Sequence, residues 1–194
     1  MKFKIFKFKN VTSTNDLAIN LIKKGNKKIG CVFAKKQTKG RGTFGKRWIS
    51  DEGNLFISLF FPLKKKYPNF AEFSIINPII ISNVIKTLCK KSKVNLKFPN
   101  DVFLNGKKIC GLLQEIITLE KNKFLIIGIG INLISNPNIK RKYKATNIFL
   151  ETKEKVKTKK IINLIINSYE NFFHNIKSYN YLNFKRKAES LALN

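Results

Sequence analysis

The dipeptide Asn105-Gly106 separates two apolar segments, residues 102–104 and 107–117. Asn-Gly is preferred in two-residue type I′ turns, because the twist of that turn matches the twist of two antiparallel strands. The pattern therefore predicts a β-hairpin at this point, and a sheet that is at least partly antiparallel. Other short apolar segments indicate further strands. They are residues 2–9, 30–34, 55–61, 94–97 and 124–133.

Helical patterns lie between and after these strands. Ser13 or Thr14 can cap a helix that Gly25 can end, and apolar residues at helical spacing occur in 71–91 and 158–177. A further short helix is expected near residue 190. Helices and hairpins mix without strict βαβ alternation, so we expect an α+β fold with a mainly antiparallel or mixed sheet and flanking helices. No Pro-, Gly- or Ser-rich linker interrupts residues 1–194, which predicts a single domain.

The formal net charge is +28, from 39 Lys and Arg against 11 Asp and Glu. Such a charge is typical of nucleic-acid-binding proteins. However, the positive residues are nearly all Lys, and abundant Lys, Asn, Ile and Phe together are what an A/T-rich codon bias produces. We therefore interpret most lysines as solvated surface residues and expect no DNA binding. A basic surface would still attract a nucleotide or an acidic protein.

The sequence predicts a cytoplasmic protein without a membrane span. The first nine residues alternate apolar and basic side chains, unlike a signal peptide. The longest apolar run, 124–131, is shorter than the ~20 residues that cross a bilayer. Cys31, Cys89 and Cys110 form no CxxC pair, so we interpret them as reduced thiols of the core.

A glycine-rich basic loop over residues 40–48 is the first candidate site. Three glycines within six positions allow positive φ angles and close backbone approach to a ligand. Arg41, Lys46 and Arg47 add positive charge, and Trp48 offers a flat face for a base. The loop suits nucleotide phosphates, although its spacing is neither that of a P-loop nor that of a Rossmann turn. The alternatives are a flexible surface loop and, for Trp48, a position in the core.

Lys97 ends an apolar strand and is followed by Phe98-Pro99-Asn100-Asp101. A rigid turn after the lysine would hold its side chain in one direction. Burial of the ammonium group would need an anionic partner, such as a carboxylate together with a phosphate. The alternative is a surface lysine whose stem packs along an edge strand.

Gly128 and Gly130 interrupt an apolar strand that ends at Asn132. Because glycine weakens a strand, its presence suggests that another group lies close to the backbone. Asn132 would then be placed to bind a phosphate or a metal-bound water. A β-bulge with a hydrogen-bonded Asn132 is an equal alternative.

Other catalytic chemistries have little support in the sequence. His174 is the single histidine and falls in a helical segment, where we expect a packing or surface role. It forms no recognisable Ser-His-Asp or Cys-His set. No His or Cys cluster has the spacing of zinc ligands.

Seven motifs, taken in order, resemble the catalytic domain of biotin–protein ligases, the biotin–[acetyl-CoA-carboxylase] ligases, over nearly the whole chain. The motifs are Ser13-Thr14-Asn15, Gln37-Thr38-x-Gly40-Arg41-Gly42-x-x-Gly45-x-x-Trp48, Gly53-Asn54-Leu55, Lys97-x-Pro99-Asn100-Asp101, Lys108-x-x-Gly111-x-Leu113-x-Glu115, Gly128-x-Gly130-x-Asn132 and Ala145-Thr146. The resemblance implies a fold related to class II aminoacyl-tRNA synthetases and lipoate ligases. It also implies two half-reactions: biotin and Mg-ATP form biotinyl-5′-AMP, and a lysine of a biotin carboxyl carrier protein then attacks this mixed anhydride.

The resemblance further implies the roles of individual residues. Residues expected around biotin are Ser13, Thr14, Asn15, Gln37, Gly40, Arg41, Gly42, Thr43, Lys97 and Gly111. Residues expected around ATP are Lys46, Arg47, Trp48, Asn100 and Asn132, with Mg²⁺ held by the ATP phosphates near Asn132. We expect Lys97 and Arg41 to be catalytic, because positive charge offsets the repulsion between a carboxylate and a phosphate.

The chain departs from the family pattern in the glycine loop, which usually reads Gly-Arg-Gly-Arg-x-Gly-Arg. Thr43 and Lys46 stand where the second and third arginines are expected. Loss of charge at residue 43 predicts that the adenylate escapes more readily and labels nearby lysines. We expect neither a helix-turn-helix domain nor most of the small SH3-like C-terminal domain.

Three alternatives stay open at this point. A lipoate or octanoate ligase shares the implied fold, although the Arg-Arg-x-x-Gly-Gly motif of those enzymes is absent from the sequence. A basic nucleic-acid-binding module would need no ATP turnover. A decayed ligase would fold without activity. Either a monomer or a homodimer is compatible with the sequence.

Overall fold

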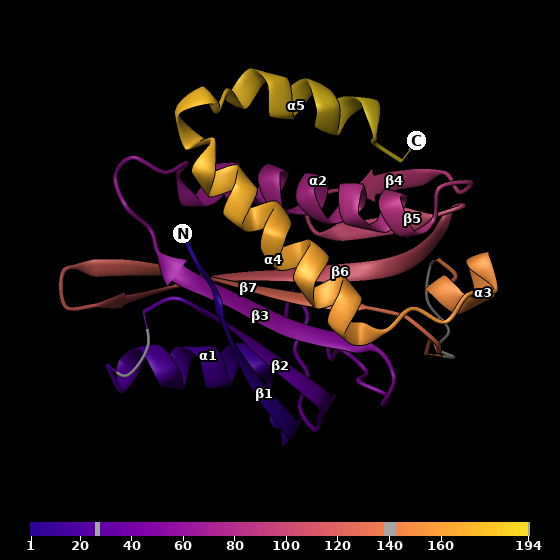
Figure 1. Cartoon of the computed structure of the whole chain (residues 1–194), viewed down its shortest axis with the longest axis horizontal. Helices are drawn as coiled ribbons and strands as arrows, with labels where there is room; N and C mark the ends of the chain where they lie inside the picture. Colours follow the sequence, from indigo (N-terminus) through magenta and orange to yellow (C-terminus); the bar gives the residue numbers. More distant parts are fainter. Residues whose placement is uncertain (26–27, 138–142, 194) are drawn as a thin grey trace.

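The computed structural model describes residues 1–25, 28–137 and 143–193, and it contains a seven-stranded sheet with helices on both faces (Figure 1). The strands are β1 (Lys4–Val11), β2 (Gly30–Gln37), β3 (Leu55–Pro62), β4 (Val94–Lys97), β5 (Asp101–Leu104), β6 (Lys107–Leu119) and β7 (Asn122–Ile131). The helices are α1 (Thr14–Lys23), α2 (Phe70–Leu88), α3 (Ile148–Thr152), α4 (Thr158–His174) and α5 (Tyr181–Ser190), with a 3₁₀ turn at Ile176–Ser178. The strand order is β1-β2-β3-β7-β6-β5-β4.

The sheet is mixed and mainly antiparallel, which confirms the predicted α+β class. Strands β1 and β2 are parallel, and the other neighbouring strands are antiparallel. Asn105 and Gly106 have φ angles of 49° and 74°, and they connect β5 to β6 as the predicted turn. Positive φ at both central positions is the requirement of a type I′ turn.

The largest differences from the sequence prediction are in β2 and α3, while β1 and β7 are each displaced by two residues from their expected bounds. Strand β2 continues past residue 34 to Gln37, because β1 pairs with it at Lys36 and Gln37. The prediction ended this strand at residue 34 because the residues that follow are polar. Helix α3 was not predicted, since its five residues are too few to show a helical period; Asn147 caps it by accepting a hydrogen bond from the N–H of Leu150.

The two faces of the sheet are covered by different helices. Successive residues of a strand point to opposite faces. One face of β7, with Ile127 and Ile129, belongs to the main core under α2 and α4. The other face, with Phe124 and Ile126, packs with Phe60 of β3 against α1. Figure 1 accordingly shows α1 on one side of the sheet and α2, α4 and α5 on the other.

The face under α1 changes from large to small residues along the strands. Beyond Ile126 on this face of β7 come Gly128 and Gly130, which pair with Ser58 of β3 and Gly111 of β6 respectively. Helix α1 begins over this region, and the strands themselves place no large side chain there. This local absence of large strand side chains leaves room for groups from other segments and positions the site.

Cys31, Cys89 and Cys110 are all buried free thiols in the main core. Burial raises the pKa of Cys31 to about 12, so its thiol is protonated at neutral pH and chemically unreactive. In the part of the chain that the structure describes, no helix is both long and apolar enough to cross a membrane.

Candidate active site

A cavity of about 1210 Å³ opens over the small residues of the sheet. The glycine loop and the segment around Lys97 converge on it, together with the start of α1. The predicted site residues that line it are Ser13, Thr14, Asn15, Gln37, Arg41, Gly42, Thr43, Lys46, Arg47, Trp48, Lys97, Asn100 and Gly111. Gly40 and Asn132, both in the described part of the chain, do not line it.

A polar corner forms where the N-terminus of α1 meets the end of β2. Ser13 caps α1, because its hydroxyl accepts a hydrogen bond from the N–H of Asp16 at 3.4 Å. The backbone N–H and the hydroxyl of Thr14 both lie within hydrogen-bond distance of Gln37 Oε1, at 2.8 and 3.0 Å. Gln37 Nε2 donates to Ser50 Oγ at 2.9 Å. The corner therefore presents oriented hydroxyl and amide groups to the cavity.

The strand glycines make room for side chains from other segments. A Cβ atom on Gly128 would lie 2.5 Å from Asn15 Oδ1, and one on Gly130 would lie 2.5 Å from Cε2 of Trp48. Gly111 is in similar contact with the indole ring, at 2.6 Å from Cζ3. The pairing of β6 with β7 is regular here. The close-neighbour interpretation of these glycines is therefore confirmed, and the β-bulge alternative for them is wrong.

Trp48 crosses the floor of the cavity over Gly111 and Gly130. Its Nε1–H is buried and has no hydrogen-bond partner among the described residues. Buried donors are normally paired, and unpaired ones call for an explanation. The nitrogen lies against the sheet, because a Cβ atom on Gly130 would be 2.6 Å from it.

The glycine loop is a small hairpin. Arg41 and Arg47 form an antiparallel bridge, and the Gly42 N–H donates to the Lys46 carbonyl at 2.6 Å. Phe44 and Gly45 stand at its tip with φ angles of 54° and 70°, and Phe44 is 90% exposed. The expected positive φ is thus found at Gly45 and not at the first two glycines of the loop.

Gly40 approaches the protein's own backbone instead of the cavity. A Cβ atom there would lie 2.5 Å from the carbonyl oxygen of Trp48 and 2.7 Å from Ser50 Oγ. The Trp48 N–H donates to the Gly40 carbonyl at 2.9 Å. Gly40 is therefore required to close the base of the hairpin.

The charge of Arg41 is already offset by two carboxylates. Its guanidinium group donates to both oxygens of Glu115, at 2.8 and 2.7 Å, and to Asp16 Oδ1 at 2.7 Å. The hydrogen bonds that Arg41 donates to Glu115 raise the pKa of Arg41 above its ordinary value. Bidentate pairing of this kind also fixes the side-chain direction. Arg41 therefore anchors the start of the hairpin to β6.

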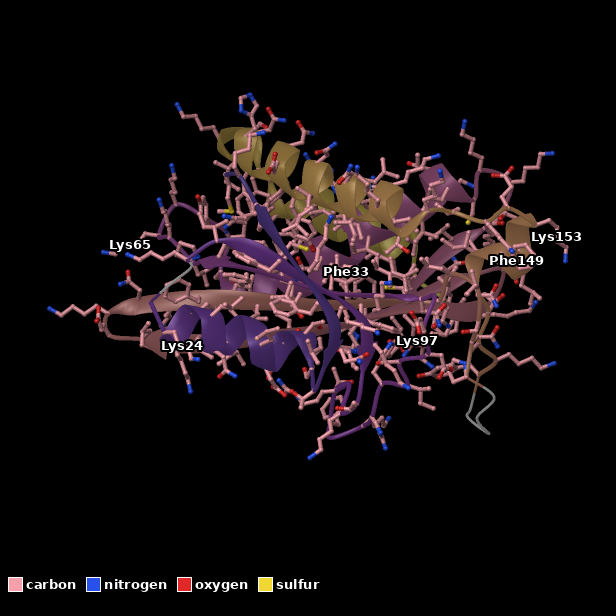
Figure 2. The ribbon with its side chains drawn as sticks, turned by 60° about the horizontal axis from the view of Figure 1, so that its bottom comes forward. Lys24, Phe33, Lys65, Lys97, Phe149 and Lys153 are labelled. Carbon is pink, nitrogen blue, oxygen red and sulfur yellow. The ribbon has the colours of Figure 1, made fainter. Side chains whose placement is uncertain are left out.

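Lys97 lies at the cavity with its ammonium group 4.4 Å from the ring centroid of Tyr143. No carboxylate in residues 1–25, 28–137 or 143–193 forms an ion pair with it. In Figure 2, Lys97 lies within the outline of the molecule, whereas the side chains of Lys65 and Lys153 project at its periphery. Lys97 ends the edge strand β4, as the surface alternative required, and its half-buried side chain lines the cavity.

Lys108 is a second cavity lysine, and the sequence interpretation had not assigned it to the site. Its Nζ lies 2.6 Å from Asp101 Oδ1 and 5.5 Å from the ring of Trp48. Residues three apart on a regular strand point to opposite faces. A register shift in the β5–β6 pair, which skips Ile109, breaks this alternation and lets Lys108 and Gly111 both reach the cavity. The sequence signal was its place in the Lys108-x-x-Gly111 motif.

Asn100 connects the turn after Lys97 with the glycine loop. Its Nδ2 donates to Thr43 Oγ1 at 3.3 Å and to the carbonyl of Leu112 at 3.2 Å. Asn132 does not line the main cavity. Its side chain donates to the carbonyl of Thr146 at 2.9 Å and borders a small side cavity of about 40 Å³. The phosphate and metal role of Asn132 stays a prediction.

The sequence pattern that defines the biotin/lipoate A/B protein ligase family matches residues 6–132. The chain belongs to this family. The match contains the predicted site residues from Ser13 to Asn132. It confirms the resemblance that the seven motifs indicated.

Members of the family from several organisms align with most of the chain. The bifunctional ligase/repressor BirA of Bacillus subtilis is 31% identical over 94% of this chain. A biotin–[acetyl-CoA-carboxylase] ligase of Paracoccus denitrificans is 30% identical over 65% of it. The chain spans 58% of the length of the Bacillus protein and 53% of the Paracoccus protein.

Solved structures of the family share the fold. The biotin protein ligase of Aquifex aeolicus in complex with biotin and ATP superimposes with a TM-score of 0.80 at 30% identity, covering 97% of this chain and 78% of the Aquifex chain. The Leishmania major biotin protein ligase in complex with biotinyl-5-AMP gives a TM-score of 0.83 at 24% identity, covering 97% and 81% of the two chains. The biotin–lipoate ligase fold predicted from the sequence is therefore confirmed.

Proposed function

We propose that the protein uses ATP to convert biotin into biotinyl-5′-AMP and transfers the biotinyl group to a lysine of a biotin carboxyl carrier protein. The observation that carries the proposal is one cavity in which a polar corner, an indole floor and two lysines face each other. Relatives named as biotin ligases, and an Aquifex relative in complex with biotin and ATP, support it. The cavity of about 1210 Å³ exceeds the roughly 300–1000 Å³ typical of a single drug-sized ligand, which suits two substrates.

The polar corner is the proposed site of the biotin ureido ring. A cyclic urea carries one carbonyl acceptor and two N–H donors. The hydroxyl of Ser13 is capable of donating to the carbonyl, because its oxygen accepts from the Asp16 N–H and its proton stays available. Thr14 Oγ1 and Gln37 Oε1 supply acceptors for the N–H groups. The apolar ring of biotin would then lie over Gly128 and Leu113, which line the cavity beside this corner.

The two lysines are proposed to balance charge during activation. A biotin carboxylate oxygen attacks the α-phosphorus of ATP, and pyrophosphate leaves. Both reactants are anions, so fixed positive charge must offset their repulsion. Lys97 and Lys108 supply it, while Arg41 acts mainly in holding the glycine hairpin, because its charge is paired with Glu115 and Asp16. No general base is needed, since a carboxylic acid is already ionised at neutral pH.

Transfer completes the proposed reaction. The neutral amine of the carrier lysine attacks the biotinyl carbonyl carbon, AMP leaves with the bonding electron pair, and the amine nitrogen releases one proton to water. An amide forms as the mixed anhydride breaks. The protein's contribution is positioning of the anhydride and exclusion of water by the glycine hairpin above it.

Mg²⁺ would enter as the Mg-ATP substrate. Within the described ranges, no group of three His, Cys, Asp or Glu side chains is arranged to hold a metal ion. Asp101 lines the cavity, but Lys108 and Tyr143 occupy its oxygens, at 2.6 and 3.2 Å. Mg²⁺ is commonly held by substrate phosphates with few protein ligands. We therefore place it on the ATP phosphates and propose a cytoplasmic enzyme, where carrier protein and ATP meet.

An ATP–pyrophosphate exchange assay tests the proposal. With labelled pyrophosphate, biotin is expected to stimulate exchange into ATP, and lipoate is expected to give no exchange above background. Mass spectrometry of a biotin carboxyl carrier protein after incubation with ATP, Mg²⁺ and biotin should show one biotinyl group on one lysine. Exchange with lipoate alone would favour a lipoate ligase. Exchange with neither acid would contradict ligase activity of either kind.

A further inference from the structure

Ser58 is a buried polar residue behind the proposed biotin corner. It lies in the middle of β3, is 0% exposed, and does not line the cavity. Its Oγ lies 2.8 Å from Thr14 Oγ1 and in close hydrogen-bond contact with Asn15 Oδ1. Nothing in the sequence pattern distinguishes Ser58 from the apolar residues around it. Its neighbours, however, are the residues assigned to the ligand corner.

The amide groups at both ends of this cluster have fixed orientations. Asn15 Nδ2 donates to Glu115 Oε2 at 2.6 Å and to the Leu113 carbonyl at 3.3 Å, so Asn15 Oδ1 must face Ser58. Gln37 Nε2 donates to Ser50 Oγ, whose own contact at 3.2 Å is the Trp48 carbonyl oxygen. Gln37 Oε1 must therefore face Thr14.

Four oxygen atoms consequently form a continuous row. The contacts run from Asn15 Oδ1 to Ser58 Oγ, then to Thr14 Oγ1, and then to Gln37 Oε1 at 3.0 Å. Amide oxygens carry no proton, and each hydroxyl carries one. Three oxygen–oxygen contacts thus share the two protons of Ser58 and Thr14. Whichever way the hydroxyl groups rotate, one contact has no proton between its oxygens.

We propose that Ser58 is a positioning residue that makes this corner select ligands with an N–H donor. The inference rests on the proposed function and specifies how its substrate is recognised. Asn15, Thr14 and Gln37 line the cavity, whereas Ser58 does not. A ureido N–H directed between Thr14 Oγ1 and Gln37 Oε1 supplies the missing proton. Gln37 Oε1 also accepts from the Thr14 backbone N–H at 2.8 Å, so it keeps one donor without a ligand. A ring without N–H groups, such as a dithiolane, still leaves two oxygens of the row facing each other without a proton between them, which disfavours its binding.

Removal of the Ser58 hydroxyl changes how many hydroxyl protons are available for the oxygen–oxygen contacts of the row. In Ser58→Ala, the Thr14 proton is free to satisfy Gln37 Oε1, so the Thr14–Gln37 contact is complete, while Asn15 Oδ1 loses its hydroxyl partner. The ligand N–H then contributes less to the free energy of binding, although the residues that line the cavity are unchanged. The variant should therefore lose discrimination for the N–H group more than it loses general binding.

The experiment compares biotin with its two ureido N-methyl derivatives in ATP–pyrophosphate exchange. For the wild type, methylation of the nitrogen that faces the corner should raise KM by about tenfold or more, the scale of one lost hydrogen bond to a site built for it. In Ser58→Ala, KM for biotin should rise about tenfold while KM for that derivative changes less than about threefold. The kcat for biotin should change by a smaller factor than KM.

The matched control is Ser82→Ala. Ser82 is also buried, but it lies in α2 and its hydroxyl donates to the Ile79 carbonyl. This variant should lose stability by a similar amount and keep the wild-type ratio of the two KM values. Ser58→Cys, whose thiol is a weaker donor and acceptor, should give an intermediate ratio, and it replaces Ser58→Ala if that variant does not fold.

Two unfavourable results have different meanings. If Ser58→Ala and Ser58→Cys weaken biotin and its N-methyl derivative by the same factor, Ser58 is merely structural and the inference is overturned, while biotin activation stands. If the wild type shows no exchange with biotin, the proposed function itself fails and the inference fails with it.

Discussion

The two lysines of the cavity differ in how their charge is offset. Lys108 has a carboxylate, Asp101, at 2.6 Å, whereas Lys97 faces the ring of Tyr143 at 4.4 Å. A cation over an aromatic face keeps its full charge available to an incoming anion. At the scale of single residues, Lys97 is therefore the group whose removal should affect activation most.

Lys97→Ala should lower biotin incorporation into the carrier protein by about 10²–10³-fold, the range seen when one group that stabilises a developing charge is removed. Mass spectrometry of the carrier after timed incubation measures this. Lys65→Ala, in an exposed lysine at the periphery, is the matched control and should behave as the wild type. Equal incorporation by Lys97→Ala and Lys65→Ala would remove Lys97 from the mechanism.

Gly130 is needed because Trp48 occupies the space of its absent side chain. Gly130→Ala places a methyl group 2.5 Å from the indole ring and should reduce the free energy of unfolding by about 1–3 kcal/mol. Combining it with Trp48→Ala should restore much of that loss, since the two residues are in contact. Denaturant unfolding of the single and double variants measures the coupling, and strictly additive losses would contradict the contact.

At the scale of elements, the glycine hairpin is held at its base and exposed at its tip. Arg41 is tied to Glu115 and Asp16, and Arg47 Nη2 donates to the Thr38 carbonyl at 2.7 Å. The tip carries the exposed Phe44. Ligands that fill the cavity below should therefore order the tip more than the base.

Limited trypsin digestion tests this ordering. Cleavage after Lys46 should slow several-fold when biotin and ATP are added, because a protease must first open the segment that it cuts. Cleavage after Lys65, in the loop between β3 and α2, serves as the internal control and should keep its rate. An unchanged rate after Lys46 would show that the hairpin does not respond to the ligands.

Glu151 joins α3 to the β5–β6 turn. It accepts hydrogen bonds from Thr146 at 2.6 Å, Asn105 at 2.7 Å and Lys107 at 3.3 Å. Burial alone would raise the pKa of Glu151, but these hydrogen bonds outweigh it and lower the pKa below the ordinary 4.5. The carboxylate therefore stabilises the fold above pH 4.5, and this contribution is lost as the pH falls through the lower folded-state pKa.

Glu151→Gln should reduce the free energy of unfolding by about 1–3 kcal/mol at pH 7, since charged hydrogen bonds are replaced by neutral ones. The difference from the wild type should shrink as the pH falls below 4.5. Denaturant unfolding at a series of pH values provides the measurement. A difference that stays constant down to pH 3 would mean that the carboxylate charge is not what Glu151 contributes.

At the scale of the whole molecule, part of the positive charge behind the net +28 lines the cavity. Cations lining the cavity are Lys36, Arg41, Lys46, Arg47, Lys97 and Lys108. Asp51 and Asp101 also line the cavity, so positive charge predominates without being exclusive. A predominantly positive cavity raises the encounter rate with anionic partners, and salt screens this effect.

Transfer to an acidic carrier protein should therefore depend on salt. Starting from preformed biotinyl-5′-AMP, kcat/KM for the carrier should fall by about tenfold or more between roughly 20 and 500 mM KCl. Transfer to a small neutral amine is the comparison and should change little. If both acceptors respond equally to salt, electrostatic steering of the carrier is not a property of this protein.

The sequence by itself determined the class of the fold and the order of its motifs, because hairpin turns, helix caps and apolar periods are local properties. Ser13 at the cap, Asn105-Gly106 in the turn and the strand glycines all occur where they were expected. The turn after Lys97 left a surface lysine as an alternative, and only the family resemblance predicted a site role for it.

Only the tertiary structure decided which charges are available and which polar groups meet. Arg41 pairs with Glu115, 74 positions away, Lys108 reaches the cavity through a register shift, and Ser58 lies behind Thr14. Contacts between residues far apart in the sequence depend on the assembled sheet. So does the face to which each side chain of a strand points after a β-bulge. No local sequence pattern specifies these features. Which charges pair, and how many hydroxyl protons the oxygen atoms of the site share, can therefore be determined only from the folded chain.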